Sequence, residues 1–267
     1  MNTVLITGST DGIGKETARQ LALKGWQVIL HGRSEQRCKS TVEEIRKATG
    51  NSDIKYVCAD LTHFVAIRKM AEEVKAGFGS LKVLINNAGI FKPQQSFSSD
   101  GIEQTFAVNH LSYYLLTGLL LDLLIKNAPA RIINVSSMAH SSQMDFDNLR
   151  GQKHYSGHEA YAQSKLANIL FTFRLAEKLT GSSVTVNCLH PGVINTKLLQ
   201  AGWGMGGGLV EKGAETSVYL ATSSEVEKIT GKYFSNNRIT NPAEIASDRE
   251  IQEQLWYVTA GLCGLNY

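Results

Sequence analysis

Short apolar runs rich in valine and isoleucine alternate with longer helical patterns along almost the whole chain. These runs are apolar on both faces, which is typical of parallel strands covered by helices on both sides. Repeated strand–helix–strand order predicts an α/β fold, a doubly wound parallel sheet of about seven strands with helices on both faces. The expected strands are Val4–Thr7, Gln27–His31, Ile54–Ala59, Val83–Asn86, Arg131–Val135, Val184–Leu189 and Lys232–Ser235.

Helical patterns separate these strands, and two of the connections are long. We expect binding loops at about 138–159 and 198–212, because both exceed the usual connection of about 2–6 residues; a tolerated surface insertion is the alternative. The sequence contains no linker, repeat or low-complexity segment, so residues 1–267 are expected to form a single domain. The expected helices include Ile13–Lys24, Ser34–Thr49, Phe64–Phe78, Ile102–Lys126 and His158–Leu179.

The composition, 43% hydrophobic and 19% charged, is typical of a soluble globular protein. The net charge of +3 comes without a basic stripe, so nucleic acid is not an expected partner. The most apolar helical stretch, 115–125, is interrupted by Thr117, Gly118 and Asp122. It is shorter than the roughly 18–20 residues that cross a bilayer, and the first residues show no leader pattern. We therefore expect a cytoplasmic protein without an integral membrane segment.

Cysteine and histidine residues are scattered along the chain. Cys38, Cys58, Cys188 and Cys263 form no CxxC pair and are expected to be reduced thiols. The histidines form no HExxH or other close ligand pair, so no metal site is expected. The C-terminal segment 255–267 is unusually apolar for a tail. We expect it to pack on the core, with closure of a substrate pocket or contact with another subunit as alternatives.

A glycine-rich turn, TGSTDGIG at 7–14, follows the first expected strand and opens the first helix. Glycines in this position let the backbone approach a pyrophosphate, whose charge is met by the N–H groups of the helix N-terminus. The spacing differs from GxGxxG, and a plain strand-to-helix connection is the alternative. The position after the first strand favours a dinucleotide site.

The second expected strand ends at His31, and Gly32 and Arg33 follow without an acidic residue. NAD-binding folds place an acidic side chain there for the ribose 2′-hydroxyl. An arginine can instead bind a 2′-phosphate with two hydrogen bonds. The sequence therefore favours NADP(H), with a solvated arginine at a helix start as the alternative.

Tyr161 and Lys165 are spaced i, i+4 in a helical segment, so both project from one face. A nearby cation favours the phenolate and lowers the tyrosine pKa, which would let the oxygen exchange a proton with an alcohol or carbonyl. Ser136 and Ser137 end a strand at the same edge as the glycine-rich turn, where a hydroxyl can stabilise a substrate oxygen. Capping of the next segment by the serines, and a surface Tyr–Lys contact, are the alternatives.

These motifs together resemble the short-chain dehydrogenase/reductase family. They comprise TGSTDGIG at 7–14, NNAG at 86–89, Asn109, the serines at 136–137, YAQSK at 161–165 and the Pro191-Gly192 turn. The run at 12–18 and the segment around Tyr233-Phe234-Ser235 are similar to the retinol-dehydrogenase-like branch. Ser137 and Tyr161 lie 24 residues apart, an insertion that this branch shares.

The resemblance implies a Rossmann-type fold and an NADP(H)-dependent oxidoreductase that moves a hydride between nicotinamide and a carbonyl or alcohol. Tyr161 would be the acid/base, with its pKa lowered by Lys165 and the nicotinamide charge, and Ser137, in preference to Ser136, would stabilise the substrate oxygen. Lys165 would hold the nicotinamide ribose and Asn109 a water of a proton relay. Coenzyme binding would involve Gly8, Ser9, Gly12, Ile13 and Gly14 at the pyrophosphate, Arg33 at the 2′-phosphate, Asp60 and Leu61 at the adenine, Asn87 and Gly89 at the adenosine ribose side, and Pro191, Gly192, Val193 and Thr196 at the carboxamide.

The substrate is expected to be a small molecule, an apolar aldehyde, ketone or retinoid-like compound, as for a carbonyl reductase. Two alternatives keep the fold: a reductase of double bonds or pigments, and a non-enzymatic NADPH-binding interaction protein. The resemblance further implies a homodimer or homotetramer that pairs through the helices holding Asn109 and Tyr161.

Overall fold

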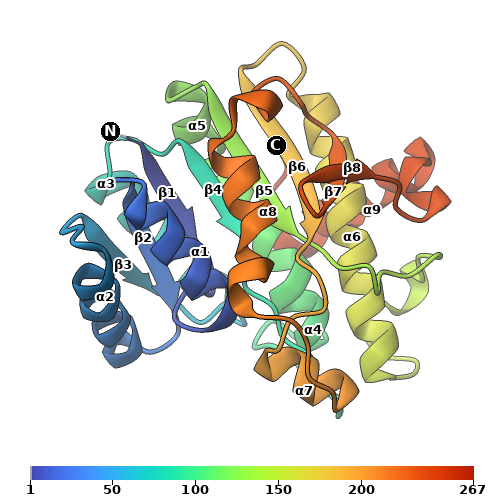
Figure 1. Cartoon of the computed structure of the whole chain (residues 1–267). Helices are drawn as coiled ribbons and strands as arrows, with labels where there is room; N and C mark the ends of the chain where they lie inside the picture. The colour runs from blue at the N-terminus through green and yellow to red at the C-terminus, as the bar shows by residue number, and fades with distance from the viewer. Residues whose placement is uncertain (1) are drawn as a thin grey trace.

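An eight-stranded sheet runs through the computed structural model, which describes residues 2–267 (Figure 1). The strand order is β3-β2-β1-β4-β5-β6-β7-β8, parallel from β3 to β7, with β8 antiparallel to β7. The α/β fold is confirmed, and each expected strand lies within one residue of its predicted ends. The strands are β1 (Thr3–Ile6), β2 (Gln27–Gly32), β3 (Ile54–Cys58), β4 (Val83–Asn86), β5 (Ala130–Val135), β6 (Val184–His190), β7 (Lys232–Ser235) and β8 (Arg238–Thr240).

Helices cover both faces of this sheet. One face carries α1 (Gly12–Leu23), α2 (Glu35–Thr49) and α8 (Val210–Thr222); the other carries α3 (Phe64–Gly77), α5 (Ser112–Lys126) and α6 (Gly157–Lys178) (Figure 1). Side-chain caps fix where several helices begin: the hydroxyls of Ser34 and Ser156 accept the N–H groups of Arg37 and Glu159. The strand order reverses between β1 and β4, which opens a crevice at the carboxyl ends of the strands.

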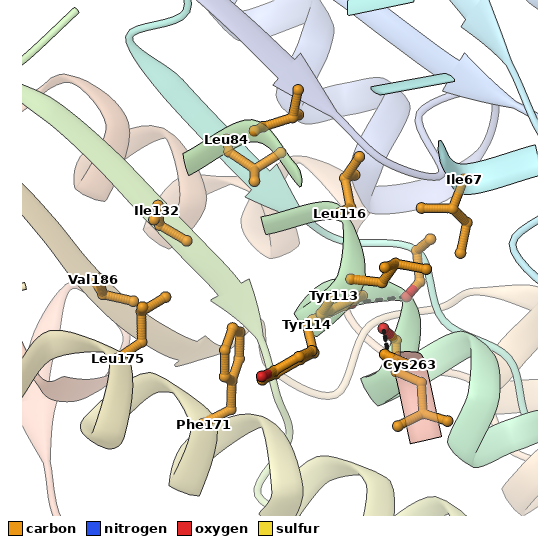
Figure 2. Packing of buried hydrophobic residues seen from close by; sticks show 14 of the residues in the cluster. Ile67, Leu84, Tyr113, Tyr114, Leu116, Ile132, Phe171, Leu175, Val186 and Cys263 are labelled. Atoms are coloured by element: carbon orange, nitrogen blue, oxygen red, sulfur yellow. Dashed lines mark hydrogen bonds between the residues drawn. The ribbon is translucent and has the colours of Figure 1, made fainter. Parts of the chain in front are cut away.

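The larger apolar core lies between the sheet and α3, α5 and α6. Figure 2 shows Leu84, Ile132 and Val186 of the sheet facing Tyr114 of α5 and Phe171 of α6. All five side chains are almost fully buried. Burial of this apolar surface fixes α6 against the end of β5, and this contact brings Ser136 and Ser137 close to Tyr161 and Lys165.

Three sequence-based boundaries need correction. β8 was missed: Asn236 and Asn237, both with positive φ, form the tight turn that folds it back on β7. The stretch at 198–212 is largely helical, since α7 (Lys197–Trp203) and the start of α8 occupy most of it. The expected helix at 102–126 is broken into α4 (Gln104–Phe106), a π-helical turn (Ala107–Leu111) and α5.

The C-terminal segment packs on the core, as expected. Helix α9 (Arg249–Cys263) lies against α5 and α6 and buries Leu255, Trp256 and Cys263. Its end is held by Arg68, which donates to the Cys263 carbonyl at 2.7 Å. Among residues 2–267, the continuous stretch Gln104–Lys126 is long and apolar enough to cross a membrane, and 72% of its most apolar window is buried within the fold, as in a core helix.

Candidate active site

A cavity of about 1410 Å³ lies at the carboxyl ends of β1 to β6, where the strand order reverses. It is lined by residues from the glycine-rich turn, from the ends of β2, β4 and β5, and from α6 and α7. Most of the predicted coenzyme-binding and catalytic residues therefore share one cavity. Two of them, Ser9 and Asn109, are not among the lining residues.

The glycine-rich turn has the geometry of a phosphate cradle. Gly8 and Gly12 have φ of 64° and 54°, a conformation that favours glycine. A Cβ on Gly8 would lie 2.8 Å from the Cα of Ala88, and one on Gly14 would lie 2.4 Å from the Asn87 side chain. The backbone alone fits this space, so the start of α1 lines the cavity without intervening side chains at Gly8 and Gly14.

Two residues near the turn have structural contacts that sequence reasoning did not assign. The Ser9 hydroxyl is buried, donating to Ile6 and accepting from the His31 N–H at 2.9 Å, so it holds β1 to β2. The His31 ring accepts the Gly8 N–H at 3.0 Å through Nδ1, and its Nε2 lies 3.1 Å from the Ala59 carbonyl. Burial lowers the pKa of His31 to about 4, which keeps the ring neutral and able to accept.

Arg33 is exposed at the rim of the cavity, where Arg37 and Lys15 also line the wall. Asp60 lies close by. Burial alone would raise its pKa, but hydrogen bonds from Thr62 and the charge of Arg33 lower it below the usual value. The end of β2 therefore presents the guanidinium groups of Arg33 and Arg37, which could bind a phosphate, with the carboxylates of Asp60 and Asp11 beside them.

Asn87 and Gly89 follow β4 on the opposite wall. The Asn87 amide donates to the carbonyls of Thr7 and Gly8, at 2.8 and 3.2 Å, so it braces the glycine-rich turn. Gly89 leaves room beside the reactive groups: a Cβ there would lie 3.6 Å from both Lys165 Nζ and Asn109 Oδ1.

Tyr161 and Lys165 lie on one face of α6 and are both nearly fully buried. Lys165 Nζ donates to the Val135 carbonyl at 3.0 Å and lies 5.6 Å from the centre of the Tyr161 ring. The Ser136 hydroxyl donates to the Lys165 carbonyl at 2.7 Å, which ties β5 to α6. The Ser137 hydroxyl accepts the Ala139 N–H at 3.1 Å. It also lowers the pKa of Tyr161, against the larger effect of burial.

Burial dominates the electrostatics of this pair. It raises the pKa of Tyr161 to about 12, with partial opposition from the Ser137 hydroxyl, and lowers the pKa of Lys165 to about 7. Removal from water disfavours the phenolate and the ammonium alike, which explains why the two shifts run in opposite directions. The lowering of the Tyr161 pKa by Lys165 and the nicotinamide charge stays a prediction.

Asn109 lies in the π-helical turn behind the cavity wall and is fully buried. Its amide donates to the Ile90 carbonyl and to the Ser164 hydroxyl, both at 3.0 Å, and its Oδ1 accepts the Ile90 N–H at 2.8 Å. Asn109 thus joins the segment after β4 to α6. It does not line the cavity itself but contacts Ile90, which does.

Pro191, Gly192, Val193 and Thr196 follow β6 and line the cavity as predicted. Thr196 also caps α7, accepting the Leu199 N–H at 3.2 Å. At the far end of α7, the Trp203 ring lies edge-on to Tyr161, with ring centres 5.4 Å apart.

Phe91 completes an aromatic wall with Trp203 and His158, at ring-centre distances of 5.6 and 5.0 Å. His158 Nε2 is 2.9 Å from the Gly202 carbonyl and so holds the end of α7. The sequence did not predict this wall, although Trp203 within a glycine-rich stretch is a signal for it.

The two long connections contribute unequally to the cavity. The segment at 138–159 supplies only Met138 and Ala139, whereas the segment at 198–212 supplies Leu198, Leu199, Gln200, Trp203, Met205 and Val210. The rest of the segment at 138–159 encloses a separate cavity of about 550 Å³ beside Glu103 and Gln163. Within residues 2–267, no group of three or more His, Cys, Asp or Glu side chains is placed to hold a metal ion.

Comparison with known proteins agrees with this arrangement. The family profile described as short chain dehydrogenase matches residues 2–206. Human retinol dehydrogenase 13 is 40% identical, covering 98% of this chain and 85% of that protein. Mouse retinol dehydrogenase 12 is also 40% identical, covering 99% of this chain and 87% of that protein. The predicted resemblance to the retinol-dehydrogenase-like branch is confirmed.

Solved structures show the same fold. A protein from Mycobacterium paratuberculosis described as putative and uncharacterized is 28% identical, with a TM-score of 0.84, over 100% of this chain and 95% of that one. A putative short chain dehydrogenase from Escherichia coli, complexed with NADPH, is 23% identical, with a TM-score of 0.74, over 89% of this chain and 97% of that one.

Proposed function

The chain belongs to the short-chain dehydrogenase family, and on this premise we propose that it is an NADP(H)-dependent oxidoreductase of apolar aldehydes, ketones and the corresponding alcohols. The family binds a nicotinamide coenzyme and acts on alcohol or carbonyl groups. The observation that carries the proposal is the cavity that joins the glycine-rich turn to Tyr161, Lys165 and Ser137.

Arg33 supports NADP(H) over NAD(H). It lies at the rim beside the end of β2, where an acidic residue would otherwise accept from a ribose hydroxyl. The cradle of Gly8 and Gly14 has no room for side chains, so the backbone at the start of α1 can approach a pyrophosphate closely. When bound, the coenzyme supplies or accepts the hydride, and its oxidised ring carries a positive charge into the site.

Tyr161 is suited to donate a proton to a carbonyl oxygen. Burial raises its pKa to about 12, so the phenol is protonated at neutral pH and can act as the proton donor when a carbonyl is reduced. Ser137 is the better hydroxyl for the substrate oxygen, because the Ser136 hydroxyl donates to the Lys165 carbonyl. Lys165 lies beside the Val135 carbonyl, the Tyr161 ring and Gly89, and its ammonium group would hold the nicotinamide ribose of a bound coenzyme.

The aromatic wall supports an apolar substrate. Phe91 and Trp203 present rings next to Tyr161, and Leu198, Leu199 and Met205 extend the apolar lining from α7 and the segment after it. Relatives named retinol dehydrogenases share 40% identity with this chain, which favours a retinoid-like or other extended apolar compound.

A coenzyme and substrate test decides the proposal. Purified protein is titrated with NADPH and NADH by fluorescence, and NADPH consumption is then followed with a panel of short and long aliphatic, aromatic and polyene aldehydes. We expect tighter binding of NADPH and turnover that improves with apolar length. Binding of neither coenzyme, or binding without turnover over the whole panel, would contradict the proposal.

A further inference from the structure

A buried hydrogen-bond chain connects α9 to the back of the active site. The Thr259 hydroxyl of α9 lies 3.0 Å from Nε2 of His110, and Nδ1 of His110 lies 3.2 Å from Oδ1 of Asn168. The Asn168 amide then donates to the Asn109 carbonyl at 2.8 Å. His110, Asn168 and Thr259 are all about 99–100% buried, so the chain is closed to solvent.

The donors and acceptors of this chain have one consistent direction. The Asn168 N–H groups point to carbonyl oxygens, so Oδ1 must accept, and Nδ1 of His110 must carry the proton. Nε2 of His110 is then unprotonated and accepts from the Thr259 hydroxyl. Burial lowers the pKa of His110 to about 4, which keeps the ring in this neutral form at physiological pH.

Asn168 lies between the π-helical turn that holds Asn109 and the end of β5. Its amide donates to the Asn109 carbonyl and, at 3.4 Å, to the Val135 carbonyl that also accepts from Lys165 Nζ. Asn168 lies one turn beyond Lys165 on the same face of α6, in line with Tyr161. Asn168 therefore sets the π-helical turn of Asn109 relative to the end of β5.

Thr259, at the α9 end of the hydrogen-bond chain, is held in place by the packing of the C-terminal segment on α5. Trp256 and Tyr267 pack on Tyr114 of α5, with ring centres 5.1 and 4.8 Å from it, and the Tyr267 hydroxyl donates to the Tyr114 carbonyl at 2.8 Å. Thr259 is therefore held against α5 and the π-helical turn by contacts outside the hydrogen-bond chain.

We infer that Thr259, His110 and Asn168 are positioning residues for the reaction, through which the C-terminal helix sets the place of Asn109 and of the carbonyl that holds Lys165. The inference rests on the proposed function, since it assigns these residues to the same site. It gives α9 a role in turnover although no residue of α9 lines the described cavity.

The test is the removal of one hydroxyl. Thr259→Val keeps the shape of the side chain and leaves Nε2 of His110 without its donor, whereas Thr259→Ser keeps the hydroxyl. Thr41→Val, which removes a buried hydroxyl from α2 outside the chain, is the matched control. For each variant, kcat is measured with NADPH and an accepted aldehyde, alongside the Kd of NADPH and the Tm.

We expect Thr259→Val to lower kcat about tenfold or more, because small displacements of reacting groups can cost up to about a hundredfold. The NADPH Kd is expected to stay within about twofold of wild type, with Thr259→Ser restoring kcat and Thr41→Val leaving it unchanged. A Thr259→Val protein with wild-type kcat, or a loss of kcat that Thr259→Ser shares, would overturn the inference.

A second variant decides the matter if Thr259→Val does not fold. Asn168→Asp keeps the size and the acceptor but removes both N–H donors. It also places a carboxyl group near Lys165, so the pH profile of kcat is expected to move together with a fall in kcat. An unchanged profile and kcat would refute the inference. A wild-type chain without turnover would instead contradict the proposed function.

Discussion

Lys165 Nζ donates to the Val135 carbonyl at 3.0 Å, so the buried cation of α6 is tied to the strand that ends in Ser136 and Ser137. The same carbonyl receives the Asn168 amide at 3.4 Å. This backbone oxygen therefore holds β5 to α6 together with the Ser136 hydroxyl, which donates to the Lys165 carbonyl. The cost is a cation removed from water, and burial lowers the pKa of Lys165 to about 7 as a result.

The buried lysine predicts a pH-dependent stability. The pKa of Lys165 is about 7 in the folded protein, and an unfolded lysine titrates near 10.4. Between these values the unfolded chain binds a proton that the folded chain lacks, so this group makes stability rise with pH from about 7 to 10. Lys165→Met should remove that contribution, which approaches about 1.4 kcal/mol per pH unit for one full proton.

Urea unfolding at pH 7, 8 and 9 measures this effect. The free energy of unfolding of wild type should gain more over this range than that of Lys165→Met. Lys232→Met, at an exposed lysine of β7, is the matched control and should keep the wild-type slope. Identical slopes for Lys165→Met and wild type would mean that Lys165 stays charged in the folded protein.

Tyr161→Phe should abolish turnover while leaving coenzyme binding intact. The phenol is 6% exposed and is the proton donor of the proposed reaction. General acid catalysis contributes about 10² to 10⁴-fold, so kcat should fall by that order with the NADPH Kd unchanged. The comparison is Tyr219→Phe on α8, which loses a hydroxyl bonded to Glu225. Retention of most activity by Tyr161→Phe would assign the proton to another group.

Arg33→Ala should weaken NADPH binding selectively. Charge-assisted hydrogen bonds contribute about 1.5–3 kcal/mol, so the NADPH Kd should rise about ten- to a hundredfold. The NADH Kd should change little, because NADH lacks the 2′-phosphate. Arg238→Ala, at an exposed arginine of β8, controls for the loss of one surface charge. Equal weakening of both coenzymes would contradict the role of Arg33 as selector.

Much of the fold can be predicted from local sequence patterns. Most of the contacts that the sequence did not predict join residues that are far apart in the chain. Strand and helix patterns depend on neighbouring residues, so β1 to β7 and the glycine-rich turn were predictable. His31 was not, because its hydrogen bond to Gly8 spans two strands and depends on burial of a polar ring. Asn168 and Thr259 carry no local signal, since their partners are 59 and 149 residues away.

Other errors had signals that were not used. The Asn236-Asn237 pair is a turn sequence that tolerates positive φ, and it could have indicated β8. Thr196 precedes an apolar run and caps α7, so part of the stretch at 198–212 could have been read as helix. The spacing of Tyr161 and Lys165 indicates their proximity but carries no information on the burial that raises the Tyr161 pKa.

Two helical glycines offer a final, matched prediction about the C-terminus. Gly118 lies in the middle of α5, where a Cβ would be 2.2 Å from the Tyr267 ring; Gly261 lies in α9 with open space around it. Gly261→Ala should stabilise the protein by about 0.5–1 kcal/mol, because alanine has the higher helix propensity. Gly118→Ala gains the same propensity but must displace Tyr267, whose ring also packs on Trp256. Its Tm should therefore fall while that of Gly261→Ala rises, and Gly118→Ala combined with Tyr267→Ala should recover part of the loss. A Gly118→Ala protein as stable as Gly261→Ala would show that Tyr267 does not occupy this slot in solution.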